Sequence, residues 1–388
     1  MSPVTTTEFA RVGTPGDQPI HANRSDMSHT STPADGPRPG SRRRARTRTR
    51  GSKFRRVVLP VLLVLVLAAG GSVWWVYQGL DDNLKDGAVD LEQALGDEKN
   101  RPRREAVAGD ALNLLLLGSD SRAGANGALD GGRPGGARSD TALLVHIAKG
   151  RTEAVAVSIP RDTLVTRPEC TAPDGTVLPS ARRVMFNSVY AQAGSACTVK
   201  TVEQMSDVRV DHLVEVDFAG FKGIVDAIGG VTVRLDEPIT SGLRLDAGEH
   251  RLDGDEALKF VRTRHGYGDG SDLGRIELQQ KFLGALLAEV KRQDLLGSPA
   301  KLYRIADRLT ESLTTDSELA SLTALAEFGR SLEGIDPAAM DTVMLPVAYD
   351  KADPNRVVAV EPAASRLWEA IRTDAEIPAS VRDSPARG

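Results

Sequence analysis

The fold is decided by the stretch Asn113-Leu114-Leu115-Leu116-Leu117-Gly118-Ser119-Asp120-Ser121-Arg122, a leucine run that ends in charged residues. Two more apolar runs of strand length follow, at residues 142–147 and 154–159. Gly, Pro and polar clusters bound the runs, which predicts three buried strands. Ligands of open α/β sheets collect outside the strand ends, so we expect one charged rim there. Its candidate side chains are Asp120, Arg122, Arg138, Asp140, Arg161 and Asp162.

Helical and strand-like patterns alternate after this stretch. Residues 212–218 and 231–235 alternate like strands, residues 272–291 repeat like an amphipathic helix, and a helical pattern continues from 302 to 332 before a strand candidate at 342–346. Such alternation predicts one α/β domain over residues 111–347, with helices on both faces of the sheet. Residues 348–388 are rich in Pro, Ala and Arg, which predicts a loose C-terminal tail.

The N-terminal region predicts a membrane anchor. Residues 1–56 have the composition of a disordered tail and carry a net charge of +8, so the remaining residues carry −12 of the chain's total of −4. Residues 57–77 hold no charged side chain and are long enough to cross a bilayer. Basic residues before a first span keep that side in the cytoplasm, which predicts a single-pass protein of the cell membrane with an extracellular domain. A cleaved signal peptide and a nucleic-acid-binding arginine run are the alternatives.

Residues 78–110 are mostly polar and charged, and they predict an extracellular stalk or lead-in helix. The two cysteines of the chain, Cys170 and Cys197, lie in a polar, loop-rich insert. Disulfides persist outside the cytoplasm, so we expect these cysteines to form one. On the loop-entropy scale such a bridge contributes about 3–4 kcal/mol.

Two kinds of side chain predict phosphate chemistry. Asp120 and Asp140 are candidates for a hard cation such as Mg²⁺, which takes one or two carboxylates together with phosphate oxygens. Planar guanidinium groups bind phosphates in a bidentate way, and Arg275 shares a helix face with Gln279. Turn and cap residues or surface ion pairs are the structural alternatives, and Asp272 stands where a helix N-cap belongs. The arginines able to surround a polyanionic substrate are Arg122, Arg138, Arg161, Arg262, Arg264 and Arg275.

The motifs, in this order and spacing, resemble those of the LytR-CpsA-Psr (LCP) family. Members are membrane-anchored enzymes on the outer face of the cytoplasmic membrane, mainly of Gram-positive bacteria. They transfer glycopolymers from a polyprenyl pyrophosphate carrier to peptidoglycan. The resemblance implies a three-layer α-β-α sandwich with a central mixed sheet, preceded by one N-terminal transmembrane helix. The matching segments are residues 115–122, 138–141, 157–162, 221–233, 252–258, 260–264 and 272–280.

The resemblance also implies roles for single residues. Asp120 and Asp140 hold Mg²⁺, for which Mn²⁺ is a substitute. Two departures stand out: Arg183 occupies the place of a lysine that often precedes an Asn-x-x-Tyr segment, and Leu278 stands where an arginine commonly precedes paired glutamines. The resemblance implies a pyrophosphate-binding set, to which the reading of the residues adds Arg122. The implied set is Arg138, Arg161, Arg183, Arg262, Arg264, Arg275 and Gln279.

The implied reaction is a phosphotransfer in which a peptidoglycan hydroxyl attacks the phosphorus attached to the glycopolymer and polyprenyl phosphate leaves. Arg161 and Arg275 act on the developing charge, and Asp272 is a candidate general base. A polyprenyl pyrophosphate phosphatase or lipid-binding module is the alternative, and a membrane-bound transcriptional attenuator is a remote one because no helix-turn-helix is present. The glycopolymer itself is not readable from the motifs. An apolar groove for the lipid, with ordinary core packing as the alternative, has as candidates Phe186, Val189, Phe218, Phe221, Ile224, Phe260 and Phe282.

Overall fold

The structure of the protein is a computed structural model. For residues 107, 139–140, 272–273 and 275–276 the backbone alone is described. The structure describes residues 67, 71, 74–75, 77–119, 139–263, 266–268, 272–292, 313–336 and 340–382.

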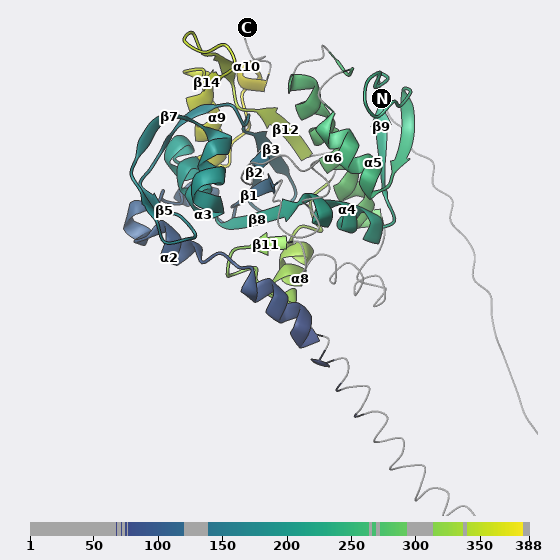
Figure 1. The fold of residues 1–388 in the computed structure, drawn as a ribbon, viewed down its shortest axis with the longest axis horizontal. Coiled ribbons are helices and arrows are strands. Elements are labelled where there is room, and N and C mark those ends of the chain that lie inside the picture. The colour runs from purple at the N-terminus through teal and green to yellow at the C-terminus, as the bar shows by residue number, and fades with distance from the viewer. Residues whose placement is uncertain are drawn as a thin grey trace, which may run out of the picture. The chain divides into compact units, whose positions relative to one another are not determined.

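A mixed sheet forms the centre of the domain (Figure 1). Among the described residues its strand order is β11-β8-β1-β2-β3-β12. β1 pairs antiparallel with β2 and parallel with β8, while β3 pairs antiparallel with β2 and parallel with β12. The three strands predicted from the leucine stretch are confirmed, and so is the mixed sheet. The strands are β1 (Leu112–Ser119), β2 (Ser139–Ile147), β3 (Ala154–Ser158), β8 (His212–Asp217), β11 (Leu313–Thr315) and β12 (Met340–Met344).

The strand ends that the sequence predicts to carry charged residues lie together along one edge of the sheet, an edge formed by strand ends and not by an outer strand. Ser119, the last residue of β1, pairs with Ser139 at the start of β2 and with Asp217 at the end of β8. Ser158 ends β3 beside Leu143 of β2. This edge, called the rim below, is therefore built from the ends of β1, β3 and β8 and the start of β2.

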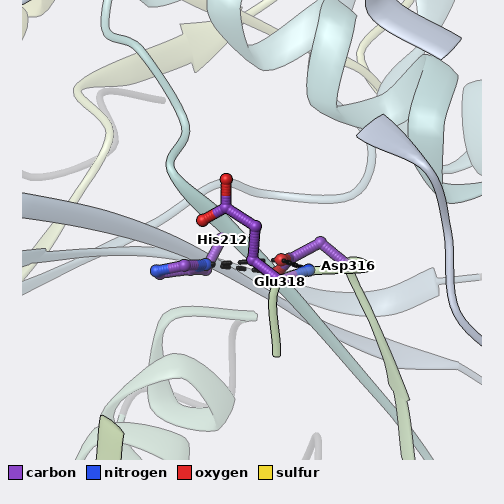
Figure 2. A group of neighbouring side chains, drawn as sticks. All are labelled: His212, Asp316 and Glu318. Atoms are coloured by element: carbon purple, nitrogen blue, oxygen red, sulfur yellow. Dashed lines mark hydrogen bonds and ion pairs between the residues drawn. The ribbon is translucent and has the colours of Figure 1, made fainter. Parts of the chain in front are cut away.

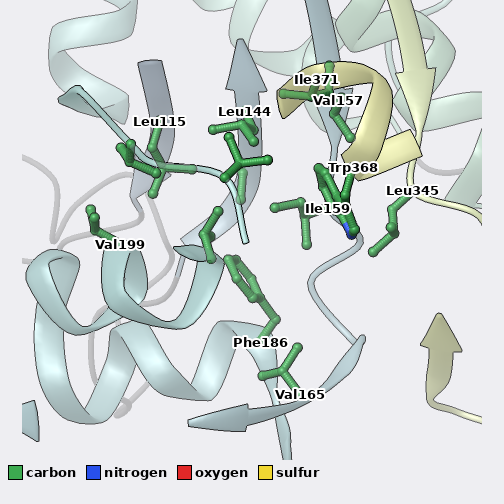
Figure 3. Close-up of a cluster of buried hydrophobic side chains, with 14 of the residues drawn as sticks. Leu115, Leu144, Val157, Ile159, Val165, Phe186, Val199, Leu345, Trp368 and Ile371 are labelled. Carbon is green, nitrogen blue, oxygen red and sulfur yellow. The ribbon is translucent and has the colours of Figure 1, made fainter. Parts of the chain in front are cut away.

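Helices cover both faces of the sheet, as the alternation of apolar residues along β1 requires. Leu115 and Leu117 point into a core formed with α3 (Phe186–Ser206) and α9 (Ala363–Arg372). Figure 3 shows part of this core, with Leu115 and Leu144 of the sheet, Phe186 of α3 and Trp368 of α9. Leu114 and Leu116 point to the other face, where α6 (Asp272–Arg292) and α8 (Leu322–Ser331) pack. The predicted three-layer arrangement is present.

A smaller unit beside the sheet has its own core. Asp217 caps α4 (Phe218–Ala227) by accepting from the backbone N of Gly220 at 2.7 Å. Gly230 has φ +95, and a Cβ there would lie 2.8 Å from the carbonyl oxygen of Leu252, so the turn after α4 requires glycine. Phe260 and Phe282 join this unit to α6. Its remaining elements are β9 (Val231–Leu235), β10 (Gly248–Leu252) and α5 (Gly254–Arg262), which opens with an Asp253–Glu256 capping box.

The prediction of a loose tail from residue 348 is wrong for residues 348–382. β13 (Val347–Tyr349) and β14 (Val357–Ala359) form a hairpin, followed by α9 and α10 (Ala379–Arg382). Ala364, Leu367, Trp368 and Ile371 repeat at helical spacing and lie buried in the α3-side core. The prediction relied on the Pro, Ala and Arg content and overlooked the helical spacing of these apolar residues. Residues 383–388 lie outside the described chain.

The prediction of a stalk or lead-in helix over residues 78–110 is confirmed for the helix, but its boundary with the domain at residue 110 is wrong. Residues 77–86 are helical, α2 spans Leu91–Leu95, and Leu84, Leu91 and Leu95 are buried. Leu91 and Leu95 belong to the same core as α3, and Arg101 pairs with the buried Glu203 at 2.7 Å. The domain therefore begins before residue 111. Two short 3₁₀ helices, η1 (Glu98–Asn100) and η2 (Ala106–Ala108), connect α2 to β1.

Of the predicted membrane span, residues 57–77, the structure describes Leu67, Gly71, Trp74, Trp75 and Tyr77. Within the described chain, no helix combines the length and apolarity that crossing a membrane needs.

The insert between β3 and α3 carries the predicted disulfide. Cys170 of β5 (Cys170–Thr171) bonds to Cys197 of α3, with Cα atoms 5.8 Å apart. β6 (Val177–Leu178) pairs with β5, and β4 (Leu164–Arg167) pairs with β7 (Ala181–Met185). The bridge ties the insert to the helix that covers the sheet.

Candidate functional site

The predicted site residues fall into three groups. Asp120, Arg122, Arg138 and Arg264 lie outside the described residues. Asp140 near the start of β2, and Asp272 and Arg275 in the first turn of α6, are described by their backbone alone. The side chains that the structure places are those of Arg161, Arg183, Arg262 and Gln279.

Arg161 lies on a tight turn that leaves the rim end of β3. The Thr163 hydroxyl donates to the Pro160 carbonyl at 2.6 Å, and the backbone N of Asn187, in the first turn of α3, donates to the carbonyl of Arg161 at 3.0 Å. The Arg161 Nε donates to the Asp162 carboxylate at 3.2 Å. The turn is thus fixed at both ends, and Arg161 is held on a rigid element with a carboxylate at its Nε edge.

Gln279 of α6 reaches back to the rim. Its Nε2 donates to the Thr141 hydroxyl of β2 and to the carbonyl of Val261 of α5, each at 3.1 Å. Thr141 itself packs against Gly118 of β1, where a Cβ would lie 3.2 Å from the Thr141 Cβ. The glycine of the leucine stretch therefore allows the close approach that aligns β2 with α6.

Arg262 ends α5 and stacks on the first residue of α4. Its Cζ lies 4.6 Å from the centre of the Phe218 ring, within the range of a cation–π contact. Because Phe218 directly follows the rim end of β8 and Val261 accepts from Gln279, Arg262 and Gln279 converge near the same sheet edge. The structure therefore brings together two predicted phosphate-binding residues from separate helices.

A half-buried acid beneath the rim was not among the predicted residues. Glu215 pairs with Leu117 in the sheet, two positions before the rim, and accepts a short hydrogen bond from the Tyr190 hydroxyl of α3. Burial raises the pKa of the Glu215 carboxyl above its ordinary value, and the hydroxyls of Tyr190, Ser119 and Ser195 offset part of that rise. The signal was present in the sequence, since strand alternation puts Glu215 on the face of the buried Leu213.

Arg183 is engaged by the C-terminal hairpin. Its φ is +56, and its Nη2 lies 2.9 Å from Oδ1 of Asp350, the residue after β13. The hydrogen bond from Arg183 lowers the pKa of the Asp350 carboxyl. A predicted phosphate-binding arginine thus has a carboxylate partner from a segment that the composition had assigned to a tail.

A histidine–carboxylate cluster lies at the opposite edge of the sheet, where β8 begins (Figure 2). The Asp316 carboxylate accepts from the backbone N of Leu213 at 2.9 Å and of Glu318 at 3.0 Å, and it lies 3.4 Å from Nδ1 of His212. Burial opposes protonation of His212, but the hydrogen bond and charge of Asp316 raise its pKa overall. Because backbone donors already occupy both Asp316 oxygens, this cluster fastens the loop after β11 to β8.

A cavity of about 740 Å³ also lies at the edge away from the rim. It is lined by His146 and Lys149 near the end of β2, by Asp341 of β12, and by Asp374 after α9. His146 Nε2 lies 3.0 Å from the Asp374 carboxylate. The cavity is therefore separate from Arg161, Arg262 and Gln279.

The face of the sheet under α6 and α8 is apolar and only partly covered. The predicted groove residues Phe186, Val189 and Phe260 are buried to 1% exposure or less, so they are core. Partly buried apolar side chains face one another on the α6 side instead: Leu112, Leu116, Val214, Leu283, Leu287, Phe328, Leu332 and Met340.

The fold and the rim together define an α/β protein that presents arginine and amide side chains at one edge of a mixed central sheet. The chain belongs to the LytR_cpsA_psr family, whose family model it matches over residues 81–373. That range begins before α2 and ends after α9, in agreement with the domain limits described above.

Relatives named for cell-wall assembly support this membership. The teichoic acid transferase TagT of Bacillus subtilis (strain 168), named a polyisoprenyl-teichoic acid–peptidoglycan transferase, is 32% identical over 294 residues, covering 73% of this chain and 84% of TagT. The cell wall biosynthesis protein LcpA of Corynebacterium glutamicum is 30% identical over 298 residues, covering 70% of this chain but 56% of LcpA. The chain thus spans just over half the length of LcpA.

Solved structures show the same fold. TagT bound to LI-WTA superposes with a TM-score of 0.56 at 25% identity, over 74% of this chain and 98% of that one. A LytR-Csp2A-Psr enzyme from Actinomyces oris superposes with a TM-score of 0.53 at 23% identity, over 74% of this chain and 95% of that one.

Proposed function

We propose that this protein is a phosphotransferase that moves a glycopolymer from a polyprenyl pyrophosphate carrier to a hydroxyl of peptidoglycan. The observation that carries the proposal is family membership over residues 81–373, because the relative TagT is named as a transferase of polyisoprenyl-linked teichoic acid to peptidoglycan. The convergence of Arg262 and Gln279 at the rim, with Arg161 on the neighbouring turn, supplies side chains suited to a diphosphate.

The chemistry is an exchange at phosphorus. The acceptor oxygen forms a new P–O bond to the phosphorus that carries the glycopolymer, the bond to the bridging oxygen breaks, and polyprenyl phosphate leaves. Reactions of this kind depend on positioning and on neutralising charge over the phosphoryl oxygens. Arg161, Arg262 and Arg275 are proposed for that role, and Asp272, the first residue of α6, as the base that takes the acceptor proton.

Asp120 and Asp140 are proposed as ligands of Mg²⁺, with Mn²⁺ as a substitute. The pairing of Ser119 with Ser139 supports this proposal, because these residues precede Asp120 and Asp140 in the sequence. Two carboxylates completed by substrate phosphate oxygens match what Mg²⁺ accepts. The ion would offset negative charge on the diphosphate.

The carrier lipid is proposed to contact the sheet face under α6 and α8. Leu116, Val214 and Leu287 are among the partly buried apolar side chains there. Burying isoprene units against such a surface is favourable by about 25 cal/mol per Å² of apolar area removed from water. A membrane anchor at residues 57–77 and an extracellular domain with the Cys170–Cys197 bridge complete the proposal, because carrier and peptidoglycan are then both within reach.

The test is a reconstituted transfer reaction. The full-length protein in detergent is incubated with a lipid-linked oligosaccharide, Mg²⁺ and a peptidoglycan acceptor, and the products are separated by mass. Glycan linked to peptidoglycan through a phosphodiester supports the proposal. Free sugar phosphate would identify a phosphatase and unchanged lipid a binding module, and either result would overturn the transferase.

A further inference from the structure

The C-terminal hairpin β13–β14 lies against the turn that carries Arg161. The backbone N of Val357 donates to the carbonyl of Asp162 at 3.2 Å, and Val357 forms a parallel bridge with Thr163. Within the hairpin, the backbone N of Asp350 donates to the carbonyl of Arg356 at 2.9 Å. The loop between β13 and β14 is therefore held next to the turn that carries Arg161.

This anchoring brings Arg356 to the Asp162 carboxylate. The Arg356 Nη1 lies 3.9 Å from Oδ1 of Asp162, while the Arg161 Nε donates to Oδ2 of the same carboxylate at 3.2 Å. One carboxylate thus stands between two guanidinium groups that come from parts of the chain about 200 residues apart.

The Arg356 guanidinium keeps most of its hydrogen-bonding capacity. To the described residues it donates one hydrogen bond, from Nη1 to the carbonyl of Asn355 at 3.0 Å. Its ion pairs with Asp162 and Asp353 are 3.9 and 3.8 Å long, beyond hydrogen-bond distance. The side chain is 29% exposed. The two carboxylates orient this guanidinium group. Because an arginine has five N–H donors, Arg356 still has donors that can bind an anion.

We propose that Arg356 is a further substrate-binding residue, which donates to the diphosphate of the carrier from the side of the C-terminal hairpin, next to Arg161. The inference rests on the proposed transferase function and extends its binding site to a segment outside the motifs. Asp350 on the same hairpin pairs with Arg183 at 2.9 Å, so the hairpin touches a second predicted phosphate-binding arginine.

The experiment measures binding of geranylgeranyl pyrophosphate with Mg²⁺ to the full-length protein in detergent, by isothermal titration calorimetry. Arg356→Ala should weaken binding about tenfold, as expected for loss of one charge-assisted hydrogen bond at a partly exposed site. Arg356→Gln, which keeps a donor for the Asn355 carbonyl but loses the charge, should weaken it similarly. Arg366→Ala removes an exposed arginine of α9 and should leave binding unchanged.

The transfer reaction gives a second measurement. Arg356→Gln should raise KM for the lipid-linked donor about tenfold while kcat changes little, because the lost contact serves binding. Wild-type affinity and KM in both Arg356 variants would overturn this inference and leave the transferase intact. A wild-type protein that binds the probe but transfers nothing would overturn the proposed function, while the affinity ratio would still test Arg356. Failure of the wild type to bind the probe would overturn both.

Discussion

Replacing Trp368 with Ala tests whether the C-terminal segment is part of the folded domain. Trp368 is 4% exposed and lies in the core between α9 and the sheet, together with Leu367 and Ile371 (Figure 3). A buried Trp removes about 200 Å² from water, which is worth about 5 kcal/mol at 25 cal/mol per Å². Substitutions of buried Phe or Trp by Ala cost about 3–5 kcal/mol, so the two estimates agree.

The assay is thermal unfolding of the full-length protein, followed by far-ultraviolet circular dichroism. The folded domain has about 300 residues, for which one kcal/mol shifts Tm by about 1.6 °C, so Trp368→Ala should lower Tm by at least about 5 °C. Arg366→Ala, on the exposed side of the same helix, should stay within about 1 °C because surface changes cost less than 0.5 kcal/mol. A Trp368→Ala variant that melts with the wild type would refute the docking of α9.

Three further outcomes are expected. Arg161→Ala should abolish transfer with Tm preserved, because its side chain is at the rim while its backbone carbonyl accepts from Asn187 in the turn. Replacing Cys170 and Cys197 by Ser should cost about 3–4 kcal/mol of unfolding free energy, measured in urea. The stability of the Glu215→Gln variant relative to the wild type should increase as pH rises. The raised pKa means that the folded state holds the proton more tightly than the unfolded chain, so the wild type loses stability as pH rises from about 4.5 toward the folded pKa.

Each outcome has a contrary result. Transfer at the wild-type rate by Arg161→Ala would remove that residue from the site. Maleimide labelling of either cysteine in the unreduced protein would contradict the bridge. A Tm difference between Glu215→Gln and wild type that stays constant from pH 4.5 to 8 would contradict a half-buried carboxylate that is destabilised when ionised. Lys281→Gln serves as a comparison, because it removes a charge at a partly buried residue whose raised pKa lies above this pH range.

The sheet was predictable because its strands are local, apolar and bounded by turn residues. Leu112–Ser119 reads as a strand without knowledge of any partner, and its alternation predicts a helix layer on each face. The prediction of a helical pattern from 302 to 332 is wrong for residues 313–315, which form β11 and pair with β8. Three residues are too few to interrupt a helical period, so only the tertiary partner reveals them.

Most contacts that the sequence did not predict join residues that lie far apart along the chain. Nothing near Arg356 or Asp350 indicates that Asp162 and Arg183 lie beside them, about 170–190 residues earlier. Glu215 could have been found from the face it shares with Leu213, whereas its partner Tyr190 could not. Core and groove wall look alike in sequence, so Phe186 was a groove candidate although it is 1% exposed.

The shared core of α2 and α9 has a consequence for how the chain folds as it is made. Leu91 and Leu95 near the start of the domain and Trp368 and Ile371 near its end belong to one cluster, about 270 residues apart. Contacts of such long range slow folding, and synthesis proceeds from the N-terminus. The leucines of α2 meet α3 about 100 residues later in the chain, whereas the α9 side of the same cluster is filled only when nearly the last helix has emerged. The C-terminal segment therefore closes this core last.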